Sequence, residues 1–164
     1  MRRQILARAT EMVFDRGFHN SSVDEILTAA GAGKGQFYRL FQNKDAFSVE
    51  LIRWIAGALL AESGELRRLQ RVSTRREFLH WWEVFIRRNR RVFQPVRGCA
   101  LGVVASELAQ TDQATDAALA AAFAAWETAL TRTLERLKLM GKLDPGTDAG
   151  ELAKLWLATY QGAA

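Results

Sequence analysis

The chain has 164 residues, of which 49% are hydrophobic and 25% charged, and its formal net charge is +5. This length allows one sizeable hydrophobic core, or a small module fused to a larger one, and no apolar run approaches the ~18 residues that a membrane-spanning helix needs. The single cysteine excludes an internal disulfide, and together with the charged N-terminus it favours a cytoplasmic protein.

The positive charge is distributed unevenly. Residues 51–98 contain eleven Lys and Arg against four Asp and Glu, whereas residues 1–50 contain seven against six and residues 99–164 five against eight. The basic excess therefore lies mainly in the middle third of the chain, outside residues 1–50. A specific reader needs only a few well-placed cations, so overall basicity is weak support for DNA binding.

The residue pattern predicts an all-α protein, because apolar residues recur at helical spacing and no stretch alternates as a strand does. The first helix is expected over residues 2–16, ending at Gly17. Phe14 and Phe18 are expected to fill a small three-helix core. Arg2 and Arg3 leave two interpretations open: a solvated helix end, or an arm that contacts phosphate or the minor groove.

Residues 22–41 predict two short helices joined by a glycine-containing turn, and the rest of the chain is organised around them. Ser22 and Glu25 have the spacing of a capping box at the start of the first helix. Gly31 suits the left-handed conformation that ends a helix. The second helix carries one apolar stripe at positions i, i+3 and i+4, made of Phe37, Leu40 and Phe41.

The opposite face of that second helix is polar and fits the major groove of DNA. Gln36 is the best candidate for reading a base, because its amide can pair with adenine N6 and N7. Gly35 lets the backbone approach DNA closely, and Arg39 can contact phosphate or guanine. Further phosphate contacts are expected from two helix starts, a phenol and two hydroxyls: Lys34, Lys44, Tyr38, Ser21 and Ser22.

Asn43 is expected to cap a long fourth helix, which starts at Lys44 and runs to about Leu69. This helix packs first on the DNA-binding unit and then on the second half, so the domain boundary falls inside it. We therefore expect a helix-turn-helix domain over residues 1–45 and a ligand-binding and dimerisation domain over residues 46–164. Four more helices are expected: from Thr74 to before Pro95, from Gly98 to about Gln110, from about Ala114 to Met140, and one capped by Asp148.

The segment AGAGKGQFYRLFQNKDAF resembles the AGVSKGTFYHYFKSKEEL-type signature of the TetR family of bacterial transcriptional regulators. Residues 5–31 fit the first two helices of that family without a gap, and the resemblance implies that the polar positions named above touch DNA. Gly33 departs from the family pattern because serine is commoner there, so a capping hydroxyl is lost. Leu40 also departs, replacing a common aromatic residue or histidine.

Residues 98–142, with a GC-x-x-G start and a later tryptophan, are similar to the LmrA/YxaF-like branch of the family. This similarity implies a hydrophobic or aromatic effector and a helical second half that forms a homodimer. Family members continue past the position of Ala164 into another apolar helix that completes the dimer face. We therefore expect the second domain either to lack that helix or to pair differently.

Aromatic residues of the second half, together with the only cysteine, are candidates to line an apolar effector pocket between helices: Trp81, Trp82, Phe85, Cys99, Phe123 and Trp126. An aromatic stripe at helical spacing is more often the pattern of a packed core, and both interpretations stay open. Cys99 also has two interpretations. Beside Arg97 at a helix N-terminus it could have a lowered pKa and sense electrophiles or oxidants, or it could be a small buried hydrophobe.

No residue pattern indicates catalysis or a metal site. His19 and His80 lie in different helical contexts, and no His and Cys cluster has ligand spacing. Glu107 and Asp112 flank a helix end, where solvated carboxylates are routine. We therefore predict no enzyme, catalytic residue, metal or cofactor, but a repressor released from a palindromic operator by a hydrophobic small molecule. The alternatives are a DNA-binding protein without ligand control and, less favoured, a small helical enzyme.

Overall fold

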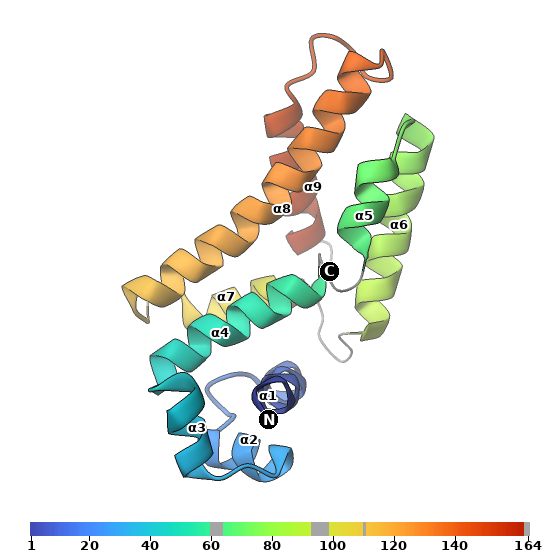
Figure 1. Cartoon of the computed structure of the whole chain (residues 1–164). Helices are drawn as coiled ribbons and strands as arrows, with labels where there is room; N and C mark the ends of the chain where they lie inside the picture. Colours follow the sequence, from blue (N-terminus) through green and yellow to red (C-terminus); the bar gives the residue numbers. More distant parts are fainter. Residues whose placement is uncertain (60–63, 93–98, 110, 163–164) are drawn as a thin grey trace.

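The computed structural model describes residues 1–59, 64–92, 99–109 and 111–162, and within these residues the chain forms helices and no strand (Figure 1). The all-α prediction is confirmed. None of the described helices is both long and apolar enough to span a membrane. The helices are α1 (Arg2–Arg16), α2 (Val23–Ala30), α3 (Lys34–Phe41), α4 (Lys44–Gly57), α5 (Glu65–Arg71), α6 (Arg75–Val92), α7 (Ala100–Leu108), α8 (Gln113–Leu139) and α9 (Ala149–Gly162).

Helices α1 to α3 form one end of the molecule, next to the start of α4 (Figure 1). They share a hydrophobic core with α4, in which α3 and α4 contribute aromatic rings. The ring centroids of Phe37 and Phe41 on α3 lie 5.3 and 5.0 Å from that of Phe47 on α4. All three side chains are 1% exposed. Phe14 and Phe18 are buried beneath α1 as predicted. This packing fixes α3 against α4, because aromatic rings in edge-to-face contact lock each other's orientation.

The predicted capping box at the start of α2 is present in both directions. The Glu25 N–H donates to Ser22 Oγ at 3.2 Å, and the Ser22 N–H donates to Glu25 Oε2 at 3.0 Å. At the other end of α2, Gly31 has a φ of 62°, which is the left-handed conformation expected of a glycine that ends a helix. Local sequence therefore determines both ends of α2.

The predicted single fourth helix is wrong beyond Gly57. Helix α4 ends there, and α5 begins as a separate helix after Gly64, whose φ is 73°. A residue in this left-handed conformation cannot continue a right-handed helix. The apolar stripe nevertheless continues, because Leu69 on α5 is fully buried.

Helix α8 is the central helix of the second half. Helices α4, α5, α7 and α9 all pack against it (Figure 1), and its N-cap Asp112 accepts a hydrogen bond from the Thr115 N–H at 2.9 Å. The end of the helix predicted to stop before Pro95, and the helix limits predicted at Gly98 and Gln110, lie outside the described residues. Since α4 also contacts α1, it packs on both halves of the chain.

Candidate DNA-binding surface and effector groove

Helix α3 has two chemically different faces. Phe37 and Phe41 are buried on its inner side, and Leu40 is half-buried. The side predicted to face DNA is exposed throughout, and Tyr38 has 58% of its surface open to solvent. Its exposed residues are Lys34, Gly35, Gln36, Tyr38 and Arg39. The helix can therefore offer polar groups to a partner without any change in the core behind it.

The Gln36 side chain is partly committed to α3 itself. Its Oε1 accepts the Gly33 N–H at 3.2 Å. Glycine at this N-cap has no hydroxyl to satisfy the first amides of the helix, so Gln36, three residues on, supplies the reciprocal half of a capping box. The amide NH₂ group of Gln36 carries no such commitment to Gly33. The predicted bidentate pairing with adenine would require Oε1 to leave the Gly33 amide, whereas a single donor contact would not.

Lys34 forms an ion pair across the turn between α2 and α3. Its Nζ lies 2.9 Å from Asp24 Oδ2, and both side chains are mostly exposed. The hydrogen bond from Lys34 to Asp24, with the attraction between their charges, raises the pKa of the Lys34 ammonium above its ordinary value. An exposed pair of this kind is weak and screened by salt, so a DNA phosphate can compete with Asp24 for the ammonium.

Lys44 is the first residue of α4, and its side chain lies over the ring of Phe18, in the turn between α1 and α2. Its Nζ lies 5.4 Å from the centre of the Phe18 ring. The preceding residue, Asn43, caps α4 as predicted, because its Oδ1 accepts the Ala46 N–H at 2.8 Å. An exposed cation beside the free amides of a helix N-terminus is a suitable phosphate site.

The two predicted serine contacts differ in the structure. Ser21 is only 4% exposed, and its hydroxyl donates to the Gly17 carbonyl at 2.8 Å. The prediction that Ser21 offers a hydroxyl to DNA is therefore wrong. Its hydroxyl instead closes the turn after α1. Ser22 is exposed, although its Oγ also donates to Glu25 Oε2 at 2.7 Å, and these bonds lower the pKa of the Glu25 carboxyl.

Arg2 is neither a simply solvated helix end nor an arm that reaches outward. Its Nη1 donates to both carboxylate oxygens of Glu50 on α4 at 2.8 and 2.9 Å, and its Nη2 donates to the Leu40 carbonyl at 2.6 Å. The Arg3 guanidinium lies 5.5 Å from the Trp54 ring. The first turn of α1 thus joins the C-terminal end of α3 to α4, because the two terminal nitrogens of one guanidinium bind the Leu40 carbonyl and the Glu50 carboxylate.

Two sequence profiles match this chain. Residues 5–51 match the profile described as bacterial regulatory proteins of the tetR family, and residues 72–164 match the C-terminal domain of LmrA/YxaF-like transcriptional regulators. The chain belongs to the TetR family of transcriptional regulators. This confirms the predicted family and the expectation of a regulator as opposed to an enzyme.

Individual relatives agree with this family assignment over nearly the whole chain. The transcriptional regulator AcuR of Cereibacter sphaeroides is 30% identical over 98% of this chain and 73% of its own length. The transcriptional repressor DhaR of Mycobacterium sp. strain GP1 is 22% identical over 99% of this chain and 80% of its own length. A TetR-family crystal structure from Cytophaga hutchinsonii superposes with a TM-score of 0.83, at 22% identity, over 99% of this chain and 80% of that one.

In the LmrA/YxaF-like half of this TetR-family protein, most of the predicted ligand-binding aromatics pack against one another. The Phe85 ring lies 5.4 Å from that of Trp81, 5.8 Å from that of Trp82 and 4.7 Å from that of Trp126. Their exposed fractions are 6% or less, whereas Phe123 is half-buried. Between the two interpretations of this stripe, the observed packing is that of a core.

The cysteine of this regulator is buried as well. Cys99 is 7% exposed at the N-cap of α7, and this burial raises the pKa of its thiol above the ordinary value, although hydrogen bonds from the Gly102 and Leu101 amides act in the opposite direction. Of the two interpretations of Cys99, its burial and the direction of this pKa shift favour the small buried hydrophobe over the reactive thiol. Arg97, the cation expected beside the thiol, lies outside the described residues.

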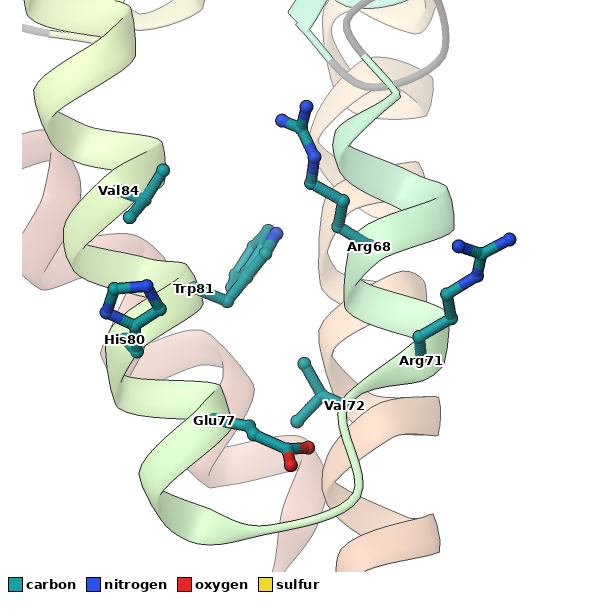
Figure 2. A pocket seen from close by; sticks show the side chains of 7 residues that line it. All are labelled: Arg68, Arg71, Val72, Glu77, His80, Trp81 and Val84. Carbon is teal, nitrogen blue, oxygen red and sulfur yellow. The ribbon is translucent and has the colours of Figure 1, made fainter.

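A hollow of about 390 Å³ lies between α5 and α6 and includes one of the predicted ligand residues, Trp81 (Figure 2). Its volume falls within the range of small-molecule sites. Figure 2 shows Trp81 pointing from α6 toward α5, where two arginines stand. The lining residues are Arg68, Arg71, Val72, Glu77, His80, Trp81 and Val84.

A buried carboxylate behind this groove holds Trp81 in place. Glu65 is 1% exposed, and its Oε2 accepts the Trp81 Nε1–H at 3.0 Å. Its Oε1 accepts hydrogen bonds from Arg68 at 2.5 Å and Arg88 at 3.2 Å. A buried carboxylate persists only when it is paired and hydrogen-bonded. Local spacing could indicate only Arg68, on the same helix as Glu65, whereas Trp81 and Arg88 come from α6, 16 and 23 residues further along the chain.

Glu107 is the second carboxylate whose contacts the residue pattern does not predict. It was expected to be a solvated carboxylate at a helix end, but its side chain binds the backbone of the turn between α1 and α2, accepting the N–H groups of Phe18 and His19. The partners are 88 and 89 residues away in the sequence, so no local pattern could have indicated the contact.

Proposed function

We propose that this TetR-family chain is a repressor that binds a palindromic operator as a homodimer and leaves it when a hydrophobic small molecule binds the second half. The observation that carries the DNA part is the exposed polar face of α3 backed by the buried cluster of Phe37, Phe41 and Phe47. A rigid helix with such a face fits the major groove. The name of the relative DhaR, a transcriptional repressor, supports repression over activation.

Within this proposal the residues of the surface have distinct roles. Gln36 reads a base edge with its amide, and Gly35 lets the backbone of α3 come close to the groove. The ammonium of Lys34 leaves its ion pair with Asp24 and binds a DNA phosphate. Lys44 binds another phosphate at the start of α4. Phosphate or base contacts from the remaining exposed positions complete the surface: Ser22, Tyr38 and Arg39.

The homodimer would pair through the ligand-binding and dimerisation domain, residues 46–164, and place two copies of α3 roughly 34–36 Å apart, one turn of DNA. Residues 1–45 would form each reading domain. Helix α4 packs on α1 in that domain and on α7 and α8 behind it. A shift of α4 would therefore change the separation of the two reading helices.

The effector would bind in the groove between α5 and α6. Its apolar part would lie against Trp81, Val72 and Val84, and a polar group could face Arg71 or His80. We assign Trp82, Phe85 and Trp126 to the supporting core, because their rings are packed on one another. The ligand would act only through a higher affinity for the conformation that does not fit the operator.

Selection of bound fragments from random DNA, followed by fluorescence anisotropy on the selected duplex, tests the DNA part of this proposal. We expect a palindromic preference, with binding that weakens steeply as salt rises. A set of hydrophobic aromatic compounds added to the complex then tests release. If no duplex is bound at low salt, the proposal fails. If DNA is bound but every compound leaves the complex intact, the protein is a DNA-binding regulator without this form of ligand control.

A further inference from the structure

Glu107, the next-to-last residue of α7, forms hydrogen bonds with the DNA-binding end of the molecule. One carboxylate oxygen, Oε2, accepts the backbone N–H of Phe18 in a short hydrogen bond and that of His19 at 3.1 Å. A third contact runs from the same residue, because the His19 Nε2 lies 2.9 Å from the Glu107 carbonyl oxygen. One glutamate thus holds two consecutive residues of the turn between α1 and α2.

The turn is shaped to receive this carboxylate. Gly17 has a φ of 91°, and a Cβ atom built on it would lie 2.8 Å from Glu107 Oε1. The backbone conformation therefore favours glycine here, and a side chain at this position would also displace the Glu107 carboxylate. The Phe18 and His19 amides lie just after the end of α1 and both donate to the Glu107 carboxylate. Because this acceptor carries a negative charge, the two hydrogen bonds are stronger than bonds to a neutral acceptor.

This turn is joined to the DNA-facing residues by a short series of contacts. The Phe18 side chain is buried, and the Lys44 ammonium lies over its ring. Ser21 fastens the same turn from inside, through its hydroxyl to Gly17 and its N–H to the Phe18 carbonyl at 3.1 Å. Ser22, the N-cap of α2, follows directly. A displacement of the turn would thus move the start of α2 and the aromatic support of Lys44 together.

We propose that Glu107 is a positioning residue for operator binding: its carboxylate fixes the orientation of the helix-turn-helix domain on the regulatory half through the Phe18 and His19 amides. This inference rests on the proposed DNA-binding function. The two helix-turn-helix domains of a dimer bind a palindrome tightly only when binding of one domain to its half-site places the other domain at the second half-site. Loss of the Glu107 contact would leave the orientation of each helix-turn-helix domain less restricted. The affinity for the operator would then fall more than the affinity for unrelated DNA, because unrelated DNA has no pair of half-sites that both domains must reach together.

The test compares the full-length variants Glu107→Ala and Glu107→Gln with a matched control, Glu83→Ala. The control removes an exposed carboxylate that pairs with Arg87 one turn along α6 and, among the described residues, forms no hydrogen bond with the turn after α1. Three quantities are measured: hydrogen exchange at the Phe18 and His19 amides, affinity for the selected operator duplex, and affinity for a scrambled duplex of equal length. Circular dichroism verifies that each variant is folded.

For Glu107→Ala we expect exchange at the two amides to accelerate about tenfold or more, and operator affinity to fall about tenfold while affinity for the scrambled duplex stays within about twofold. Glu107→Gln keeps an acceptor oxygen without the charge, so its effects should be smaller in the same direction. The Glu83→Ala control should match the parent protein. If Glu107→Ala does not fold, the folded Glu107→Gln variant decides the question by the same three measurements.

Faster exchange with an unchanged ratio of operator to scrambled affinity would overturn the inference, since Glu107 would then be only a structural contact. Unchanged exchange would overturn it as well, because the bonds would not protect the amides in solution. A parent protein that binds no duplex would refute the proposed function instead. That outcome is separate, because it appears before any variant is compared.

Discussion

Substitution of Gln36 by alanine tests the central contact of the proposed regulator. Because Oε1 accepts the Gly33 N–H at 3.2 Å, only the NH₂ group of Gln36 is available for a base edge unless the cap is broken. One such donor contact contributes about 1 kcal/mol. A dimer on a palindrome makes the contact twice, so Gln36→Ala should cost about 2 kcal/mol of specific binding, or roughly a thirtyfold loss of affinity.

The assay is fluorescence anisotropy on the selected operator, on a set of operators changed at one base pair in each half-site, and on a scrambled duplex. Gln36→Ala should flatten the preference at one base pair and leave the scrambled duplex nearly unaffected. The variant Gln36→Glu keeps the cap acceptor for Gly33 and removes the NH₂ donor. Because its carboxylate also repels phosphates and weakens binding to every duplex, the base preference and not the overall affinity is compared between the two variants. An unchanged base preference in Gln36→Ala would show that Gln36 caps α3 and reads nothing.

Three further variants or measurements test other parts of the structure. Lys44→Ala should weaken binding to the operator and to scrambled DNA by similar factors and reduce the slope of log affinity against log salt by about one unit per contact; a loss confined to the operator would contradict a phosphate role. Glu65→Ala leaves the buried Trp81 N–H without its acceptor, while the half-exposed Arg68 and Arg88 can return to water. The free energy of unfolding measured in urea should therefore fall by about 2 to 3 kcal/mol, against about 1 kcal/mol for Glu65→Gln. Equal effects of the two Glu65 variants would argue against that hydrogen bond. Burial raises the pKa of Cys99, so less thiolate is present at any neutral pH than in the unfolded chain, and maleimide labelling of the native protein should be at least about tenfold slower than in urea; equal labelling rates would refute this.

Much of the DNA-binding end could be predicted from the sequence because its determinants are local. The capping box of Ser22 and Glu25, the left-handed Gly31 and the apolar spacing of Phe37 and Phe41 all act within one helix or one turn. Such signals fix helix ends and the buried face of a helix irrespective of what lies beyond. The same reasoning failed for Ser21, because the residue type permits a DNA contact and only the folded turn directs its hydroxyl inward.

In the second half, spacing predicted helices but did not distinguish a core from a ligand site. The aromatic stripe of α6 is compatible with both, and the choice depends on which residues of α8 and α9 meet it, such as Trp126 against Phe85 and Tyr160 against Trp82. The end of α4 was misplaced for a related reason. The apolar pattern continues into α5, whereas α4 ends at Gly57 and Gly64, directly before α5, has a left-handed backbone conformation.

The sequence by itself determined the family, the helical class and the polar face of α3, since each depends on residues within about one turn to a few turns of one another. The tertiary structure alone decided three contacts: that of Arg2 with Glu50, that of Glu65 with Trp81, and that of Glu107 with the Phe18 and His19 amides, which are 16 to 89 residues apart in the chain. A charged side chain has no preferred partner until folding brings donors and acceptors within hydrogen-bonding distance and removes competing water.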